Sequence, residues 1–179
     1  VNIRNVVTRL PELRFEEPLN WIIEEGQQWA VIGPNGAGKT LIADVMQRKF
    51  ALKEGEVTFG YEGNVSNLVK SIAFKDIYSL ADCRNSYYQQ RWHSTETDEV
   101  PTIEDILNED AGSEDYHNVL SLFGIEEFLS KKLIFLSSGE LRKFLIVRTL
   151  LKRPRVLILD NPFIGLDAPS RGVLVEMLQ

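Results

Sequence analysis

The octapeptide Gly33-Pro-Asn-Gly-Ala-Gly-Lys-Thr40 decides the fold of this chain, because it satisfies the pattern G-x-x-x-x-G-K-S/T at every constrained position. An apolar stretch, 28–32, leads into it, and an apolar repeat of helical period follows it over 40–50. The small residues let backbone N–H groups face inward around phosphates, and the following helix points the positive end of its dipole at them. The pattern therefore predicts a nucleotide-phosphate site rather than a turn without ligand, formed by Gly33, Pro34, Asn35, Gly36, Ala37 and Gly38.

The last two residues of this loop carry the charge and the metal chemistry. Lys39 is expected to reach the β- and γ-phosphates of the nucleotide, and the Thr40 hydroxyl is expected to bind Mg²⁺. A second metal ligand is expected at Asp160, which directly follows the apolar run Val156–Leu159. The alternative for Asp160 is a structural role at the turn that Asn161 and Pro162 begin.

The segment LSSGE, Leu136–Glu140, precedes a helix expected over Glu140–Leu151. Backbone N–H groups and hydroxyls at a helix start form an anion site, which gives Ser137, Ser138 and Gly139 as binding candidates. One chain does not need two phosphate sites for one nucleotide, whereas two facing copies do. The alternative is an ordinary N-cap in which Ser is followed by Glu.

Length and composition limit the number of domains and the classes of protein to which the chain can belong. The length of 179 residues suits one domain, expected to span 1–179 with a helical segment at about 100–150 inserted in the core. We also expect this chain to be an excerpt of a longer product. The net charge of −6 argues against direct nucleic-acid binding, and the single cysteine excludes an intramolecular disulfide framework. No apolar run approaches the roughly 18 residues that a membrane-spanning helix needs.

Periodicity predicts the remaining elements. Strands are expected over 1–10, 19–23, 28–32, 56–59, 68–74 and 156–159, with Trp21 and Trp29 in the core. Helices are expected over 40–50, 102–107, 114–123 and 140–151, the last with one buried and one exposed face, and another helix is expected at the end of the chain.

With the phosphate loop, LSSGE and VLILD in this order, the chain resembles the nucleotide-binding domain of the ATP-binding cassette (ABC) family. The segment LRKFLIVRTLLKRPRVLILD after LSSGE, GLD at Gly165–Asp167 and GEVTF at Gly55–Phe59 are similar to that family as well. YYQQRW and WHS are similar to tandem-domain members linked to molybdate uptake. The resemblance implies an α/β fold: a P-loop NTPase core with a mostly parallel sheet, an N-terminal antiparallel β portion and a helical segment carrying the signature.

The resemblance also implies a function. Mg-ATP would be sandwiched between this domain and a second ABC domain, as a homodimer or a tandem copy, and closure would drive transport through a membrane permease subunit. The implied location is cytoplasmic, peripheral at the inner face of the membrane. The alternatives are a soluble ABC protein outside transport, and a degenerate switch module that binds ATP with little hydrolysis.

Several positions depart from the family pattern. Asn161 stands where the family carries its catalytic glutamate, and a neutral amide orients water but does not act as a general base. We therefore expect ATP binding with slow hydrolysis. For the Mg²⁺-contacting glutamine of the family the candidates are Gln89 and Gln90, of which Gln90 is preferred, with Lys75 or Asp76 as alternatives. Gln89 and Gln90 could equally belong to a solvated loop. Phe15 either replaces the adenine-stacking aromatic residue or belongs to the core.

Overall fold

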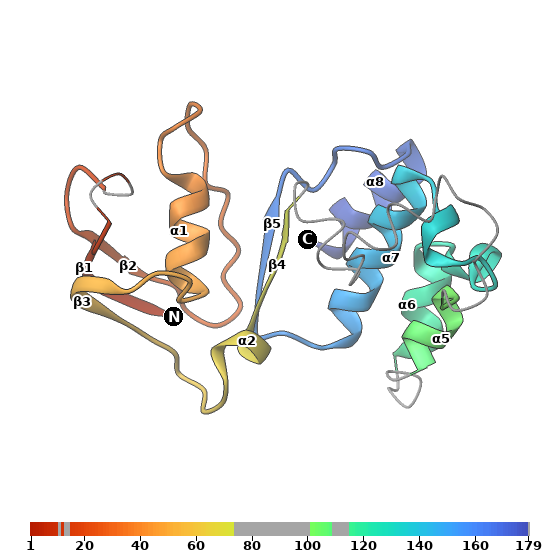
Figure 1. The fold of residues 1–179 in the computed structure, drawn as a ribbon, viewed down its shortest axis with the longest axis horizontal. Helices are drawn as coiled ribbons and strands as arrows, with labels where there is room; N and C mark the ends of the chain where they lie inside the picture. The colour runs from red at the N-terminus through yellow and green to blue at the C-terminus, as the bar shows by residue number, and fades with distance from the viewer. Residues whose placement is uncertain (11, 13–14, 74–100, 109–114, 179) are drawn as a thin grey trace. The chain divides into compact units, whose positions relative to one another are not determined.

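The computed structural model describes residues 1–10, 12, 15–73, 101–108 and 115–178 (Figure 1). The chain falls into two compact units, which are treated separately below. Unit 1 comprises Val1–Ser71 and Arg155–Ile158, and unit 2 comprises Ile72–Pro154 and Leu159–Gln179.

Unit 1 contains a three-stranded antiparallel sheet in the order β2-β1-β3. Its strands are β1 (Asn2–Thr8), β2 (Leu19–Ile22) and β3 (Leu52–Thr58). The helix α1 (Lys39–Met46) packs on one face of this sheet (Figure 1). The N-terminal antiparallel β portion of the predicted fold is thus confirmed.

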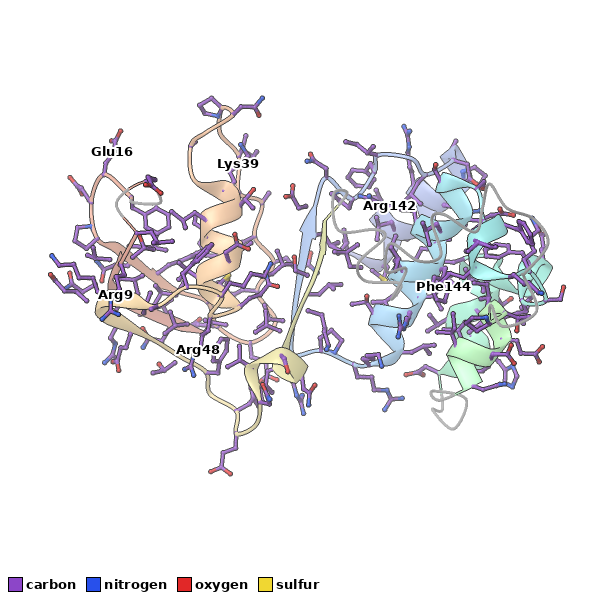
Figure 2. The ribbon with its side chains drawn as sticks, viewed as in Figure 1. Arg9, Glu16, Lys39, Arg48, Arg142 and Phe144 are labelled. Carbon is purple, nitrogen blue, oxygen red and sulfur yellow. The ribbon has the colours of Figure 1, made fainter. Side chains whose placement is uncertain are left out.

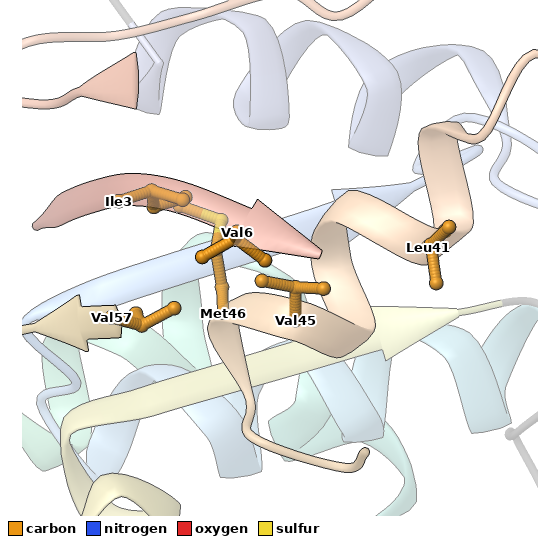
Figure 3. Packing of buried hydrophobic residues seen from close by; sticks show 6 residues of the cluster. All are labelled: Ile3, Val6, Leu41, Val45, Met46 and Val57. Atoms are coloured by element: carbon orange, nitrogen blue, oxygen red, sulfur yellow. The ribbon is translucent and has the colours of Figure 1, made fainter. Parts of the chain in front are cut away.

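The core of unit 1 lies between α1 and the sheet. Figure 3 shows Val45 and Met46 of α1 next to Val6 of β1. Ile3, Val57 and Leu41 belong to the same buried cluster. Strict alternation along β1 would put Ile3 and Val6 on opposite faces. A bulge between them changes the phase of the alternation, so that both side chains reach the same core.

This bulge requires a glycine on the neighbouring strand. Asn5 adopts a left-handed backbone conformation, φ 47°, and its N–H donates to Oδ1 of Asn20 at 2.8 Å. Opposite it, Gly55 has φ 82°, and a Cβ at Gly55 would lie 2.2 Å from the carbonyl oxygen of Asn5. No side chain fits there without displacing backbone.

The helix after the phosphate loop is shorter than predicted. α1 ends at Met46 instead of continuing to Phe50, because Arg48 turns into the left-handed region at φ 53°. The Arg48 guanidinium donates to the carbonyl oxygen of Val57 at 2.6 Å and lies over the ring of Phe59. These contacts tie the end of α1 to the end of β3.

The strand predicted over 28–32 is not formed, and this prediction was wrong. Apolar periodicity reports a tendency to be buried, whereas a strand also needs a hydrogen-bonded neighbour. In unit 1 both edges of β1 are already paired, with β2 and β3. Trp29 is 57% exposed and Ile32 is 91% exposed, so Trp29 is not the core residue predicted. Trp21 is partly buried against the core, and the two indole rings meet edge to face at 5.3 Å.

Unit 2 is built mainly from helices (Figure 1). They are α5 (Ile103–Leu107), α6 (Tyr116–Leu122), α7 (Ser138–Leu151) and α8 (Ala168–Met177), with short 3₁₀ turns at Ile125–Phe128 and Leu133–Phe135. The predicted division of α7 into one buried and one exposed face is wrong. Its buried residues surround most of the helix: Leu141, Arg142, Phe144, Leu145, Ile146, Val147 and Leu151.

Two further strands pair with each other, β4 (Val69–Ala73) and β5 (Val156–Asp160). The short helix α2 (Val65–Leu68) directly precedes β4. β5 ends at Asp160, one residue beyond the predicted apolar run. In the part of the chain that the structure describes, no helix combines the length and apolar character needed to cross a membrane.

Gly55→Ala tests the bulge. The added Cβ would collide with the Asn5 carbonyl and sit at an unfavourable φ, so we expect destabilisation of roughly 2–3 kcal/mol or more. Chemical denaturation measures the change. Gly60→Ala is the matched control, because a Cβ at Gly60 meets nothing within 4 Å. Equal stability of the two variants would contradict this description of the bulge.

Candidate functional site

The predicted phosphate-binding residues form a tight loop that runs into α1. Gly36 and Gly38 have φ values of 84° and 86°, a conformation that other residues rarely adopt. The N–H of Ala37 donates to the carbonyl oxygen of Pro34 at 3.2 Å, which closes a turn within the loop. A Cβ at Gly33 would touch that of Ala37 at 3.4 Å. The glycines at positions 36 and 38 are therefore explained by the backbone geometry of the loop itself.

Lys39 is the first residue of α1, and its side chain bonds back to the phosphate loop that precedes it (Figure 2). Its ammonium group donates to the carbonyl oxygens of Gly33 and Pro34, both at 2.8 Å. α1 has no side-chain cap and no acidic residue in its first turn. A positive charge and uncapped N–H groups therefore stand at one helix start, which is the arrangement that anionic phosphate oxygens favour.

Phe15 lies beside the phosphate loop. A Cβ at Gly38 would lie 3.4 Å from Cε1 of the Phe15 ring, and the ring also packs against the core cluster of unit 1. The structure thus places Phe15 both in the core and next to the loop. Contact with an adenine ring remains a prediction.

In unit 2, the start of α7 carries the predicted Ser137, Ser138 and Gly139. Ser137 is the N-cap: its hydroxyl accepts from the N–H of Glu140 at 3.3 Å, while Oε2 of Glu140 accepts from the N–H of Ser137 at 2.8 Å. Lys131 donates to the other oxygen of Glu140 at 2.6 Å, and this contact lowers the pKa of Glu140, with help from the Ser137 N–H. The N-cap alternative is correct as a description of the local geometry. A hydroxyl that accepts in a cap can still donate its own hydrogen to an anion.

The start of α7 is tied to the start of α8. A Cβ at Gly139 would lie only 3.2 Å from the carbonyl oxygen of Gly165. Asp167 caps α8 by accepting from the N–H of Ser170 at 2.8 Å, and Lys143 pairs with the same carboxylate at 2.8 Å. The Lys143 contact and the Ser170 hydrogen bonds hold the pKa of Asp167 well below its usual range. Asp167 therefore stays ionised and keeps both contacts throughout the physiological pH range.

Asp160 and Asn161 form a corner at the end of β5. The Asn161 backbone is left-handed, φ 53°, and its amide Nδ2 donates to Oδ1 of Asp160 at 3.0 Å. Arg142 of α7 is only 1% exposed and donates from Nη2 to the carbonyl oxygen of Asn161 at 2.5 Å. Burial lowers the pKa of Arg142, and the nearby Asp160 carboxylate acts in the opposite direction.

Sequence reasoning missed Arg142, Lys143 and Lys131. Each is a basic residue close to the LSSGE segment in the sequence, but basic side chains are ordinarily taken to be solvated. Their partners could be identified only once α7 was placed against the end of β5 and the start of α8. The predicted Gln90, its alternatives Lys75 and Asp76, and the segments YYQQRW and WHS lie outside the described residues.

The comparisons with known proteins agree on one family. A family model described as "ABC transporter" matches residues 17–164, which include the phosphate loop, LSSGE and Asp160. An uncharacterized ABC transporter ATP-binding protein of Schizosaccharomyces pombe is 32% identical over 162 residues, covering 85% of this chain and 33% of that protein. The ABC transporter ATP-binding protein ModF of Escherichia coli is 30% identical over 165 residues, covering 87% of this chain and 31% of that protein. The chain thus spans about a third of the length of these curated relatives.

The fold is shared with solved structures. The ATP-binding subunit of an ABC transporter superposes with a TM-score of 0.66 at 24% identity, covering 98% of this chain and 71% of that one. Its similarity confirms the predicted P-loop NTPase fold class.

Proposed function

Since this chain belongs to the ABC transporter family, we propose that its phosphate loop holds Mg-ATP and that a second ABC domain closes over the nucleotide from the LSSGE side. The observation that carries the proposal is the geometry of Lys39. Its ammonium group is fixed at 2.8 Å from two loop carbonyls, at a helix start without a side-chain cap. Phosphate oxygens would accept from the same ammonium group and from the backbone N–H groups of the loop.

The residues present suit Mg²⁺. Thr40 presents an exposed hydroxyl in the first turn of α1, and Asp160 presents a carboxylate at the end of β5. Both are hard oxygen donors of the kind that Mg²⁺ prefers, with phosphate oxygens and water completing the shell. When bound, Mg²⁺ would neutralise charge on the phosphates. Gln90 is retained in this proposal as a further metal contact.

The LSSGE face would act on the nucleotide of the partner. The proposed donors are the Ser137 hydroxyl and the backbone N–H groups of Ser138 and Gly139. Gly139 is tightly packed, because a Cβ there would lie 3.2 Å from the carbonyl oxygen of Gly165 and would require a small shift of that neighbour. The partner is a second copy of this domain or a tandem copy. Closure of the two domains on ATP would be coupled to a conformational change in a membrane permease. Cycles of closure and reopening would then drive transport.

Hydrolysis is proposed to be slow. Asn161 supplies an amide where the family carries its catalytic glutamate, and that amide is already bound to Asp160. It can orient a water molecule but does not accept a proton from it. ATP would therefore drive closure more effectively than it is consumed.

Replacing Lys39 by Ala tests nucleotide binding. Removal of the ammonium group deletes charge-assisted contacts with the phosphates, so ATP affinity should fall by about 100-fold or more. Isothermal titration with ATP and Mg²⁺ measures this. Lys49→Ala is the control, because Lys49 pairs with Asp44 at the far end of the same helix and should bind ATP normally. Unchanged affinity in Lys39→Ala would refute the site.

Replacing Ser137 by Arg tests closure. The bulky cation would fill the space meant for the partner's nucleotide, so we expect normal ATP binding but no ATP-dependent association in sedimentation velocity. The change also removes half of the capping pair. Glu140→Ala is therefore the control: it removes the other half of the pair and the Lys131 contact, costs about 1–2 kcal/mol of stability, and should still associate. Association of both variants would exclude the LSSGE face as an interface.

A comparison of Asn161→Glu with Asn161→Gln tests the missing base. Both side chains have the same shape and meet the same backbone strain, and only the glutamate can accept a proton. ATP turnover of the glutamate variant should exceed that of the glutamine variant by one or more orders of magnitude. Similar rates would show that another group activates water, and the slow-hydrolysis proposal would fail.

A further inference from the structure

We infer that Arg142 is a positioning residue of the nucleotide site: it holds Asn161 in a left-handed backbone conformation, from which the Asn161 amide fixes the orientation of the Asp160 carboxylate. The inference rests on the proposed function in one respect, since Asp160 matters to catalysis only as the proposed metal ligand. The geometry of the corner itself does not depend on that role.

The anchor of this arrangement is a buried cation. Arg142 lies on α7 (Figure 2), is 1% exposed and donates to the Asn161 carbonyl oxygen at 2.5 Å. Its helix is buried around most of its circumference, so the guanidinium is held by packing as well as by hydrogen bonding. A charged donor placed by a rigid helix can hold a peptide group in a conformation that the chain would otherwise leave.

The held conformation suits an asparagine. At φ 53° most residues are strained, whereas Asn and Gly adopt this region more readily. Asn161 also donates from Nδ2 to Oδ1 of Asp160 at 3.0 Å, which restrains the orientation of that carboxylate. A glutamate at the same position would place a second carboxylate beside the first. The residue that removes the general base is thus also the residue that this corner accommodates.

The first test needs no nucleotide. Hydrogen exchange of peptides covering 158–166 is measured in the intact protein for Asn161→Gly and Asn161→Ala. Gly accepts φ 53° and Ala does not, so the Ala variant should open the segment about five-fold more often. Equal opening in the two variants would overturn the inference, and this comparison leaves Arg142 untouched.

The second test repeats this pair in an Arg142→Met background. Without the Arg142 hydrogen bond, the Asn161 backbone can leave the left-handed conformation. The opening frequencies of the Ala and Gly variants, measured by hydrogen exchange, should then differ by less than about two-fold. Arg142→Lys keeps a positive donor and should restore most of the difference. The inference would be overturned if the Ala and Gly variants still differed about five-fold in opening frequency in the Arg142→Met background. It would also be overturned if that ratio were the same in the Met and Lys backgrounds.

The third test connects the corner to the proposed function. In Arg142→Met and in Asn161→Gly, the Mg²⁺ concentration for half-maximal ATP turnover should rise about ten-fold, since groups that orient a metal ligand influence metal affinity to that extent. ATP affinity in the presence of EDTA should stay within about two-fold of the wild type. An unchanged Mg²⁺ requirement would overturn the link to Asp160. Failure of the wild-type protein to bind ATP would instead refute the proposed function. The hydrogen-exchange comparison would still show whether Arg142 holds the Asn161 backbone in place.

Discussion

The N–H groups at the start of a helix have no partner within that helix, and the chain meets this constraint in two different ways. α5, α7 and α8 are capped by their own side chains, Thr102, Ser137 and Asp167. The N-cap residue of α1 is instead Gly38, which has no side chain that could accept from these N–H groups. These caps satisfy one or two of the N–H groups at each of those helix starts within the chain itself. The start of α1 is left with donors and the Lys39 charge turned toward the phosphate loop, and the proposed chemistry begins there.

Much of the fold could be predicted from local patterns, because local physics determines it. The glycine loop, the helices after it and after LSSGE, and the strands of unit 1 follow from residue type and spacing, whereas the antiparallel pairing of those strands was implied by the family resemblance. The strand expected over 28–32 failed because hydropathy carries no information about which strand edge is available. The one-sided pattern expected for α7 failed for a related reason: Phe144 and Ile146 find partners around the helix that periodicity alone does not reveal.

The corner at Asp160 shows where sequence reasoning about a site stops. The proposal that Asn161 stands in place of a catalytic base rests on the family resemblance and on the residue type, and it requires no coordinates. The left-handed backbone, the amide bound to Asp160 and the buried Arg142 are long-range facts that require the end of β5 to lie against α7. Hydropathy assigns an arginine to the surface, so Arg142 carried no signal in the sequence. The structure adds a second reason for an asparagine at this position, because asparagine adopts the left-handed backbone conformation more readily than most residues.

The ammonium group of Lys39 is immobilised by the carbonyls of Gly33 and Pro34 in the protein alone. Ordering a free lysine side chain costs up to about 2 kcal/mol of conformational entropy. Here the Lys39 side chain loses this entropy when the protein folds, so ligand binding does not have to order it again. In the proposed site, a polyphosphate entering the loop would exchange neutral carbonyl acceptors for anionic oxygens around a cation that these hydrogen bonds already position. The proposed preference for anions would then come from the conformation of the loop itself.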